Sequence, residues 1–322
     1  MKRRDDPAIS GVLLIDKPEG MTSHDVVGRV RKALGMRRVG HAGTLDPMAT
    51  GVLVVGVGPT TRLLGIVGGH DKEYEATIRL GAATTTDDRE GEVVFVAEVG
   101  AVTAIDDDAI ASAIGHFVGT IAQRPSAVSA VKVDGKRAYD RVRSGEDVEL
   151  PERTVTITAF DVRGVNRTQE NIDVDVRVEC SAGTYIRALA RDLGAELGVG
   201  GHLTALRRTR SGGVRVGDCI DIDSVSVDQL VRAAVFARGE LPVVDIGQQE
   251  AIDARHGKTL SVACTGVTAL IGPGEDLVAI VDAGARYVAV FPVGRVTRQS
   301  LEAFGEAFED LADPEAMDQA WG

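Results

Sequence analysis

A single carboxylate, that of Asp46, stands where the chain is well suited to hold a reactive group. It lies in residues 40–51, whose glycines let the backbone turn sharply and approach a ligand closely. Pro47 fixes its own φ and disfavours helix at Asp46, so the carboxylate is held on a stiff loop before an apolar stretch. With an ordinary pKa of about 3.9 such a group is ionised at neutral pH and can act as a nucleophile or a base. The alternative is an aspartate that only caps a turn.

Charge is unevenly distributed along the chain. The 322 residues carry a net charge of −12, yet residues 124–143 and 187–215 each hold six basic side chains against two acidic ones. Residues 299–322, by contrast, hold seven acids and no lysine or arginine. A third basic cluster consists of Arg29, Arg31, Lys32, Arg37 and Arg38. One such cluster is an ordinary solvated surface, but three on an acidic background favour a partner that is a nucleic acid.

The composition argues against several other classes of protein. Hydrophobic residues make up 44% and charged residues 26%, and no apolar run is long enough for a membrane helix. The charged start of the chain is followed by no apolar signal-peptide core, so we expect a cytoplasmic protein. Cys180, Cys219 and Cys264 lie far apart with no Cys-x-x-Cys pair, which argues against a metal site and a disulfide framework.

The spacing of apolar residues predicts the elements that position Asp46. Residues 11–15 form a strand, and Thr22 or Ser23 caps a helix that stops at Gly35. Strict alternation over residues 172–178 indicates a strand with one buried and one wet face, which is typical of an antiparallel or mixed sheet. Further strands are predicted at 51–57, 73–80, 92–99, 127–133, 154–162 and 203–210, with 92–99 as the partner of 73–80. Further helices are predicted at 60–67, 106–117, 185–197 and 223–237.

The texture changes after residue 240. Short apolar stretches separated by glycine-rich turns predict a small β-rich module over 241–322 that ends in an acidic helix. The remaining 1–240 form the larger catalytic domain.

Motifs follow one another in order over residues 10–215. They are Lys17-Pro18-x-Gly20-Met21-Thr22-Ser23, the loop around Asp46, Lys72-x-Tyr74, Leu80-Gly81-x-x-Thr84-x-Thr86-x-Asp88-x-x-Gly91, Gln123-x-Pro125-Ser126 and Cys180-Ser181-x-Gly183-Thr184-Tyr185-Ile186-Arg187. In this combination the chain resembles the bacterial TruB family of tRNA pseudouridine synthases, whose relatives include the catalytic subunit of box H/ACA particles. The resemblance implies an α+β pseudouridine synthase fold, in which a mixed, mainly antiparallel sheet carries flanking helices. It also implies a small, PUA-like C-terminal domain over 241–322.

The resemblance further implies a reaction. Uridine 55, in the T-loop of tRNA, is cut from its sugar, rotated and rejoined through carbon, without a metal or an organic cofactor. The expected partner is the T-arm of tRNA, and we expect a monomer with no obligatory protein partner and no membrane association.

Site residues carry over from the family one by one. Asp46 matches the nucleophile, Tyr74 a tyrosine that stacks on the base, and Tyr185 an active-site tyrosine near it. Arg187 matches an arginine that pairs with the nucleophilic carboxylate. The less specific matches are His41, which touches T-loop RNA, Lys17, which approaches the site or a phosphate, and Leu206, on the pocket wall. Because flipping a base out of its stack costs a few kcal/mol and aromatic stacking returns about 1–3 kcal/mol, aromatic residues suit this task. Ordinary core packing is the alternative for the tyrosines and Leu206, and a structural hydrogen bond for His41.

One position departs from the pattern, and three rival functions compete. Thr85 stands where many relatives have an acid, so Asp87 or Asp88 is expected to serve instead. A nucleotide-binding enzyme is suggested by Gly-x-Gly after residues 51–57, but the third glycine of that motif is missing. A catalytically silent RNA-binding protein is disfavoured by the intact site residues. An aspartyl phosphotransferase needs a paired Asp-x-Asp and a metal site, and neither accompanies Asp46.

Overall fold

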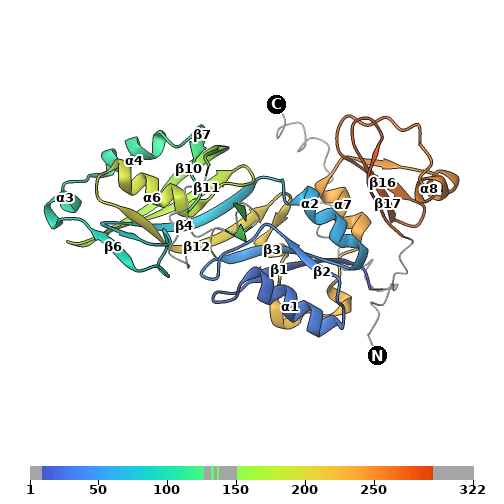
Figure 1. The fold of residues 1–322 in the computed structure, drawn as a ribbon, viewed down its shortest axis with the longest axis horizontal. Coiled ribbons are helices and arrows are strands. Elements are labelled where there is room, and N and C mark those ends of the chain that lie inside the picture. The colour runs from blue at the N-terminus through green and yellow to red at the C-terminus, as the bar shows by residue number, and fades with distance from the viewer. Residues whose placement is uncertain (1–8, 127–131, 134–135, 138–150, 293–322) are drawn as a thin grey trace. The chain divides into compact units, whose positions relative to one another are not determined.

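Two compact units make up the chain (Figure 1). The computed structural model describes residues 9–126, 132–133, 136–137 and 151–292. The first unit contains Met1–Pro47, Val52–Gly68 and Gly212–Gly322, and the second contains Met48–Gly51 and Gly69–Ser211. The chain therefore passes from one unit to the other directly after Pro47, beside the candidate nucleophile.

The first unit begins with a short β-α-β arrangement. Its opening elements are β1 (Gly11–Lys17), α1 (Ser23–Leu34), β2 (Val39–Ala42), β3 (Thr50–Val57), the 3-10 turn η1 (Gly58–Leu63) and α2 (Leu64–Val67). Thr22 caps α1 in a capping box with Asp25, and Gly35 ends the helix at a φ of 66°, so the predicted helix is confirmed. The strand order is β14-β1-β3, with β2 antiparallel to β3.

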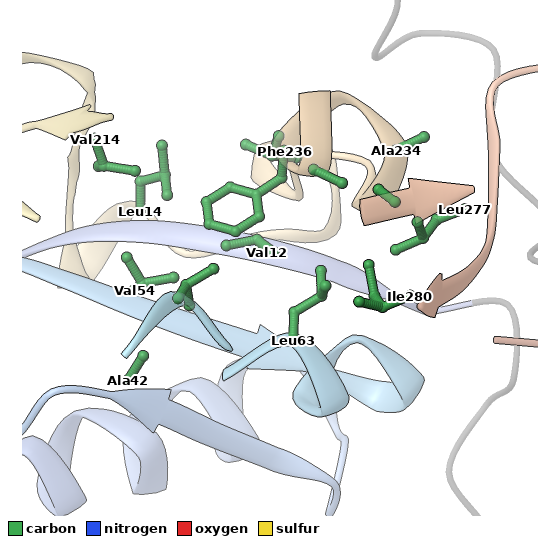
Figure 2. Packing of buried hydrophobic residues seen from close by; sticks show 14 of the residues in the cluster. Val12, Leu14, Ala42, Val54, Leu63, Val214, Ala234, Phe236, Leu277 and Ile280 are labelled. Atoms are coloured by element: carbon green, nitrogen blue, oxygen red, sulfur yellow. The ribbon is translucent and has the colours of Figure 1, made fainter. Parts of the chain in front are cut away.

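The C-terminal part of the first unit is a four-stranded sheet with two helices. After β13 (Val214–Arg215), η2 (Val216–Asp218), β14 (Ile220–Asp221), η3 (Ile222–Ser224) and η4 (Val227–Gln229) come α7 (Ala233–Glu240), β15 (Val243–Asp245), α8 (Gln248–Arg255), β16 (Thr268–Gly272), β17 (Asp276–Val281) and β18 (Tyr287–Val290). The sheet order is β15-β16-β17-β18. Figure 2 shows Phe236 of α7 packed among Val12, Leu14 and Leu277, all buried. One apolar core therefore joins residues on both sides of position 240, while the expected domain boundary there stays a prediction.

The second unit is a mainly antiparallel sheet with helices packed against it. Its elements are β4 (Lys72–Leu80), β5 (Ala82–Thr84), β6 (Val93–Val96), α3 (Val99–Thr103), α4 (Asp107–Gly115), β7 (Gly119–Gln123), β8 (Lys132–Val133), β9 (Lys136–Arg137), β10 (Arg153–Arg167), β11 (Ile172–Cys180), α6 (Ile186–Glu196) and β12 (Gly201–Ser211). The order is β12-β4-β11-β10-β7, and the first two residues of β3 pair in parallel with β12. Helix α6 packs against β12 and β4, and α4 against β10 (Figure 1). Burial alternates along the whole of β11, as its sequence predicts.

Sequence patterning gave two wrong assignments in the described chain. Residues 92–99 do not pair with 73–80: β6 pairs with β5, whereas β4 lies between β11 and β12. The predicted helix at 223–237 is instead two 3-10 turns followed by α7. Val231 exchanges two backbone hydrogen bonds of 2.8 Å with Val12, and this pairing requires extended backbone in the middle of that segment. The helix predicted at 60–67 is split into η1 and α2.

The α+β class with a large mixed sheet and a small C-terminal β-sheet is confirmed. In the part of the chain that the structure describes, no helix is long and apolar enough to cross a bilayer. The strand predicted at 127–133 falls mostly outside the described residues, and the predicted acidic helix at the end of the chain lies wholly outside them.

Candidate active site

The loop that carries Asp46 is held on both sides of that residue. Ser23, which is buried at the start of α1, donates from Oγ to the carbonyl of Leu45 (3.0 Å) and accepts from the Leu45 N–H (2.8 Å). On the other side, the Pro47 carbonyl accepts from the Gly20 N–H (2.8 Å) and from Lys17 Nζ (3.2 Å). Asp46 itself is half-buried. The backbone of the loop is thus fixed while the carboxylate keeps access to solvent.

Lys17 is wholly buried in the structure. Its ammonium donates to three carbonyls, those of Pro18 (2.9 Å), Met21 (2.6 Å) and Pro47 (3.2 Å). An ammonium offers three donors, so these bonds offset much of the cost of burying its charge. Lys17 therefore ties the turn after β1 to the loop that carries Asp46.

His41 lies in β2, directly opposite Val55 of β3, and is half-buried. The first unit thus holds Lys17, His41 and Asp46 of the expected site residues. Tyr74, Tyr185, Arg187 and Leu206 belong to the second unit.

In the second unit, Tyr74 is buried in the middle strand β4. Its cross-strand neighbours are Val178 on β11 and Arg208 on β12. Leu206, also buried, lies on β12 opposite Ala76, two residues along β4 from Tyr74. Because residues two apart on a strand share a face, Tyr74 and Leu206 lie near each other on the buried side of this sheet.

Tyr185 and Arg187 stand at the start of α6. Gln123, at the end of β7, accepts from the Tyr185 N–H (2.8 Å) and donates to the Tyr185 carbonyl (3.0 Å). Arg187 is 5% exposed; its Nη1 donates to the Thr86 carbonyl (2.9 Å) and lies 3.4 Å from Asp88 Oδ2. The start of α6 is therefore fixed by β7 on one side and by the turn after β5 on the other.

The turn after β5 contains two consecutive acids, each beside an arginine of α6. Asp88 faces Arg187, and Asp87 Oδ2 accepts from Arg191 (3.3 Å). Both of the acids expected to compensate for Thr85 thus make arginine contacts. Burial raises the pKa of Asp87 above its usual range, and the Arg191 charge opposes this shift.

Buried ionisable groups also lie on the strands beside Tyr74. Burial, assisted by the charge of Arg208, lowers the pKa of Lys72 to about 8. Its cross-strand neighbour Cys180 is buried too, and burial raises the pKa of that thiol to about 11. A thiol with so high a pKa stays protonated at neutral pH and is a poor nucleophile. Cys180 is therefore an inert core residue, as its position in a strand suggests.

Sequence reasoning quoted several of these residues as motif letters without assigning them a task. Ser23, Thr86 and Gln123 support Leu45, Arg187 and Tyr185 respectively. Each supporting residue is polar and lies in a motif that contains or precedes a site residue, which was the available signal. Among the described residues, no group of three His, Cys, Asp or Glu side chains is arranged to hold a metal ion.

Comparisons with known proteins identify the class of this fold. The family description "TruB family pseudouridylate synthase (N terminal domain)" matches residues 31–186, and "tRNA pseudouridylate synthase B C-terminal domain" matches residues 187–242. A chain from a solved Cbf5-Nop10-Gar1 complex is 26% identical, with a TM-score of 0.64 over 90% of this chain and 86% of that chain. The fold and sequence are those of a pseudouridine synthase, which is an isomerase.

Relatives named tRNA pseudouridine synthase B are closely similar over most of the chain. The one from Leifsonia xyli subsp. xyli is 55% identical over 278 residues, which are 86% of this chain and 90% of the relative. The one from Corynebacterium diphtheriae is 48% identical over 294 residues, 88% of this chain and 96% of the relative. The chain belongs to the TruB family.

Proposed function

We propose that this protein converts uridine 55, in the T-loop of tRNA, to pseudouridine, with Asp46 as the nucleophile. The observation that carries the proposal is the anchoring of Leu45 and Pro47 on either side of a half-buried carboxylate. Fixing the backbone of a reactive group in advance removes the entropy that would otherwise be lost in the transition state. The relatives' shared name supports tRNA as the substrate.

The reaction moves one bond of the uracil ring. The glycosidic bond from N1 to the sugar breaks, a bond from C5 to the sugar forms, and the hydrogen of C5 leaves as a proton. The ionised Asp46 carboxylate serves either of two routes, by attack on C6 of the uracil or by attack on or deprotonation of the sugar after cleavage. Both routes lose their nucleophile if the carboxylate becomes an amide.

The other site residues are assigned roles consistent with their positions. Tyr74 stacks on the flipped base, and Tyr185 lines the pocket from the start of α6. Leu206, on the same sheet face as Tyr74, forms part of the pocket wall. Arg187 keeps the nucleophilic carboxylate charged and oriented. Lys17, buried among carbonyls, positions the loop and does not itself contact RNA.

RNA binding is assigned to basic surfaces of this acidic protein, His41 contributing to the T-loop contact. In the first unit, Arg31, Arg37 and Arg38 line an open hollow of about 540 Å³ together with Met36. Arg31 donates to the Val39 carbonyl and Arg38 to Thr61 Oγ1, each at 2.9 Å. Of the described carboxylates, none forms an ion pair with Arg31 or Arg38, so both charges remain available to phosphates. A monomer, no obligatory protein partner and RNA contact by the C-terminal module remain predictions.

One assay tests the function directly. A tRNA transcript labelled with tritium at uracil C5 is incubated with the purified protein, without added metal or nucleotide, and released label is counted. Wild-type protein should release the label of uridine 55, and Asp46→Asn should release none while its Kd for tRNA stays within about three-fold. Asp228→Asn, which changes an exposed acid of the same unit, is the matched control. Full turnover by Asp46→Asn would refute the assignment.

A further inference from the structure

Arg191 joins three segments of the second unit. Its Nη1 donates to Asp87 of the turn after β5 (3.3 Å), and its Nη2 donates to the carbonyl of Arg124, just after β7 (2.8 Å). Its Nε donates to Asp192 on its own helix (2.8 Å). A planar guanidinium holds several partners at fixed angles, which a lysine cannot do.

The same three segments carry the residues that hold Tyr185 and Arg187. Gln123, which brackets the Tyr185 backbone, lies one residue before Arg124. Thr86, whose carbonyl accepts from Arg187, lies one residue before Asp87. Arg187 and Arg191 are four residues apart on α6, so they lie on one face of that helix and meet two consecutive acids.

Asp87 adopts a backbone conformation that is otherwise unfavourable. Its φ is +59°, in the left-handed region, where a non-glycine residue is strained by about 1 kcal/mol or more. The turn is held there by the Leu203 N–H, which donates to the Asp87 carbonyl (3.0 Å). The side chain is 13% exposed, so a charged Asp87 depends on its arginine partner.

We propose that Arg191 is a positioning residue for catalysis: by binding Asp87 and the Arg124 carbonyl together, it fixes the turn after β5 and the end of β7 against α6 and so keeps Arg187 and Tyr185 in place. The proposal rests on the proposed function, because it is read out through pseudouridine formation. Arg191 acts through other residues and is assigned no contact with the substrate.

The arrangement makes the two single changes unequal. Arg191→Gln leaves the buried Asp87 carboxylate without its main counter-charge, whereas Asp87→Asn leaves Arg191 bonded to Asp192 and to the Arg124 carbonyl. Removing one partner of a buried ion pair is damaging mainly because the other charge is stranded. The double variant Asp87→Asn/Arg191→Gln should therefore be more active than Arg191→Gln alone.

The test is single-turnover kinetics on labelled tRNA together with equilibrium binding. A misplacement of the order of an ångström lowers rates by up to about a hundred-fold, so Arg191→Gln should reduce the rate constant by about ten- to a hundred-fold with Kd changed less than about three-fold. Arg191→Lys should be intermediate. Arg167→Gln is the matched control, because Arg167 forms an exposed pair with Asp107 in the same unit. That variant should keep wild-type kinetics.

A pH profile separates this role from a general loss of folding. The groups that face Asp87 are Arg191, Arg187, Asp192 and the Ser126 hydroxyl. In Arg191→Gln the stranded carboxylate takes up a proton as the pH falls, so activity relative to wild type should recover under mildly acidic conditions. The double variant should show no such recovery. If Arg191→Gln does not fold, Asp87→Asn and Arg191→Lys carry the test by the same rate measurement.

The outcomes are distinct. Rates within two-fold of wild type for Arg191→Gln, or losses that simply multiply in the double variant, would overturn the positioning role. A wild-type protein that forms no pseudouridine would instead overturn the proposed function and leave the ion pair as a structural contact.

Discussion

Lys72 should make this protein less stable at neutral pH than it would be with an apolar residue there. The side chain is 6% exposed, and burial with the nearby charge of Arg208 lowers its pKa from 10.5 to about 8. At pH 7 the folded protein must therefore keep a charge in surroundings that disfavour it. Lys72→Met, which replaces the ammonium by an apolar group of similar length, should raise the free energy of unfolding.

The magnitude follows from the displaced pKa. At about 1.4 kcal/mol for each pH unit, the lowering corresponds to at most about 3 kcal/mol. Solvent and the bond from Lys72 to the His70 carbonyl reduce this, so we expect a gain of about 1–2 kcal/mol at pH 7. The unfolded chain keeps this proton up to pH 10.5, whereas the folded chain releases it near 8. Unfolding thus takes up a proton between these values, and the stability of the wild type should rise with pH across that window.

The assay is urea unfolding of the wild type, Lys72→Met and the control Lys32→Met, at intervals from pH 7 to 10.5. Lys32 is exposed on α1, so its replacement should leave stability almost unchanged. The difference between wild type and Lys72→Met cancels the titration of all other groups and should close as the pH approaches 10.5. A Lys72→Met protein that is less stable at pH 7, with a pH profile parallel to that of the wild type, would refute the reasoning.

Three further predictions concern other parts of the chain. Ser23→Ala removes both bonds to Leu45, so it should cost about 1–3 kcal/mol in thermal or urea unfolding and slow label release; unchanged kinetics would contradict the loop's dependence on this clamp. Arg177→Leu strands three carboxylates, so it should destabilise by about 1–3 kcal/mol at pH 7 and by less in acid, where those groups are protonated; a pH-independent difference would count against it. Arg31→Gln/Arg38→Gln should reduce the salt dependence of tRNA binding by up to about 0.9 per lost phosphate contact in the log–log slope; an unaltered slope would remove the hollow from the RNA surface.

Local chemistry is what the sequence predicts best. The start and end of α1 follow from a capping residue and a glycine, and the alternation along β11 follows from a sheet with one buried face. Both are decided by residues within a few positions of each other. The order of strands and their partners is not: β4 lies between β11 and β12, each about a hundred residues further along the chain. Two alternating strands close in sequence therefore gave a plausible but wrong hairpin.

The segment before α7 shows how a distant partner overrides local preference. Its apolar spacing is helical, yet Val231 pairs with Val12 near the start of the chain, and an extended backbone there satisfies both residues' hydrogen bonds. Helical propensity differs among ordinary residues by less than about 1 kcal/mol, which is comparable to one such hydrogen bond. The competition cannot be resolved without knowing that the partner strand is present.

Polar site residues divide along the same line. Asp46 can be proposed from its neighbours, because its loop is built from adjacent glycines and a proline. The tasks of Lys17, Gln123 and Arg191 cannot, because each acts on backbone or side chains that lie 30 or more residues away. A buried polar side chain has no meaning until its partner is known, since burial alone would be costly and only the bond makes it favourable. It follows that substitutions at such residues should be judged by the partner they abandon: removing Arg191 strands a carboxylate, whereas removing Gln123 leaves unpaired two backbone groups at the start of the helix that carries Arg187.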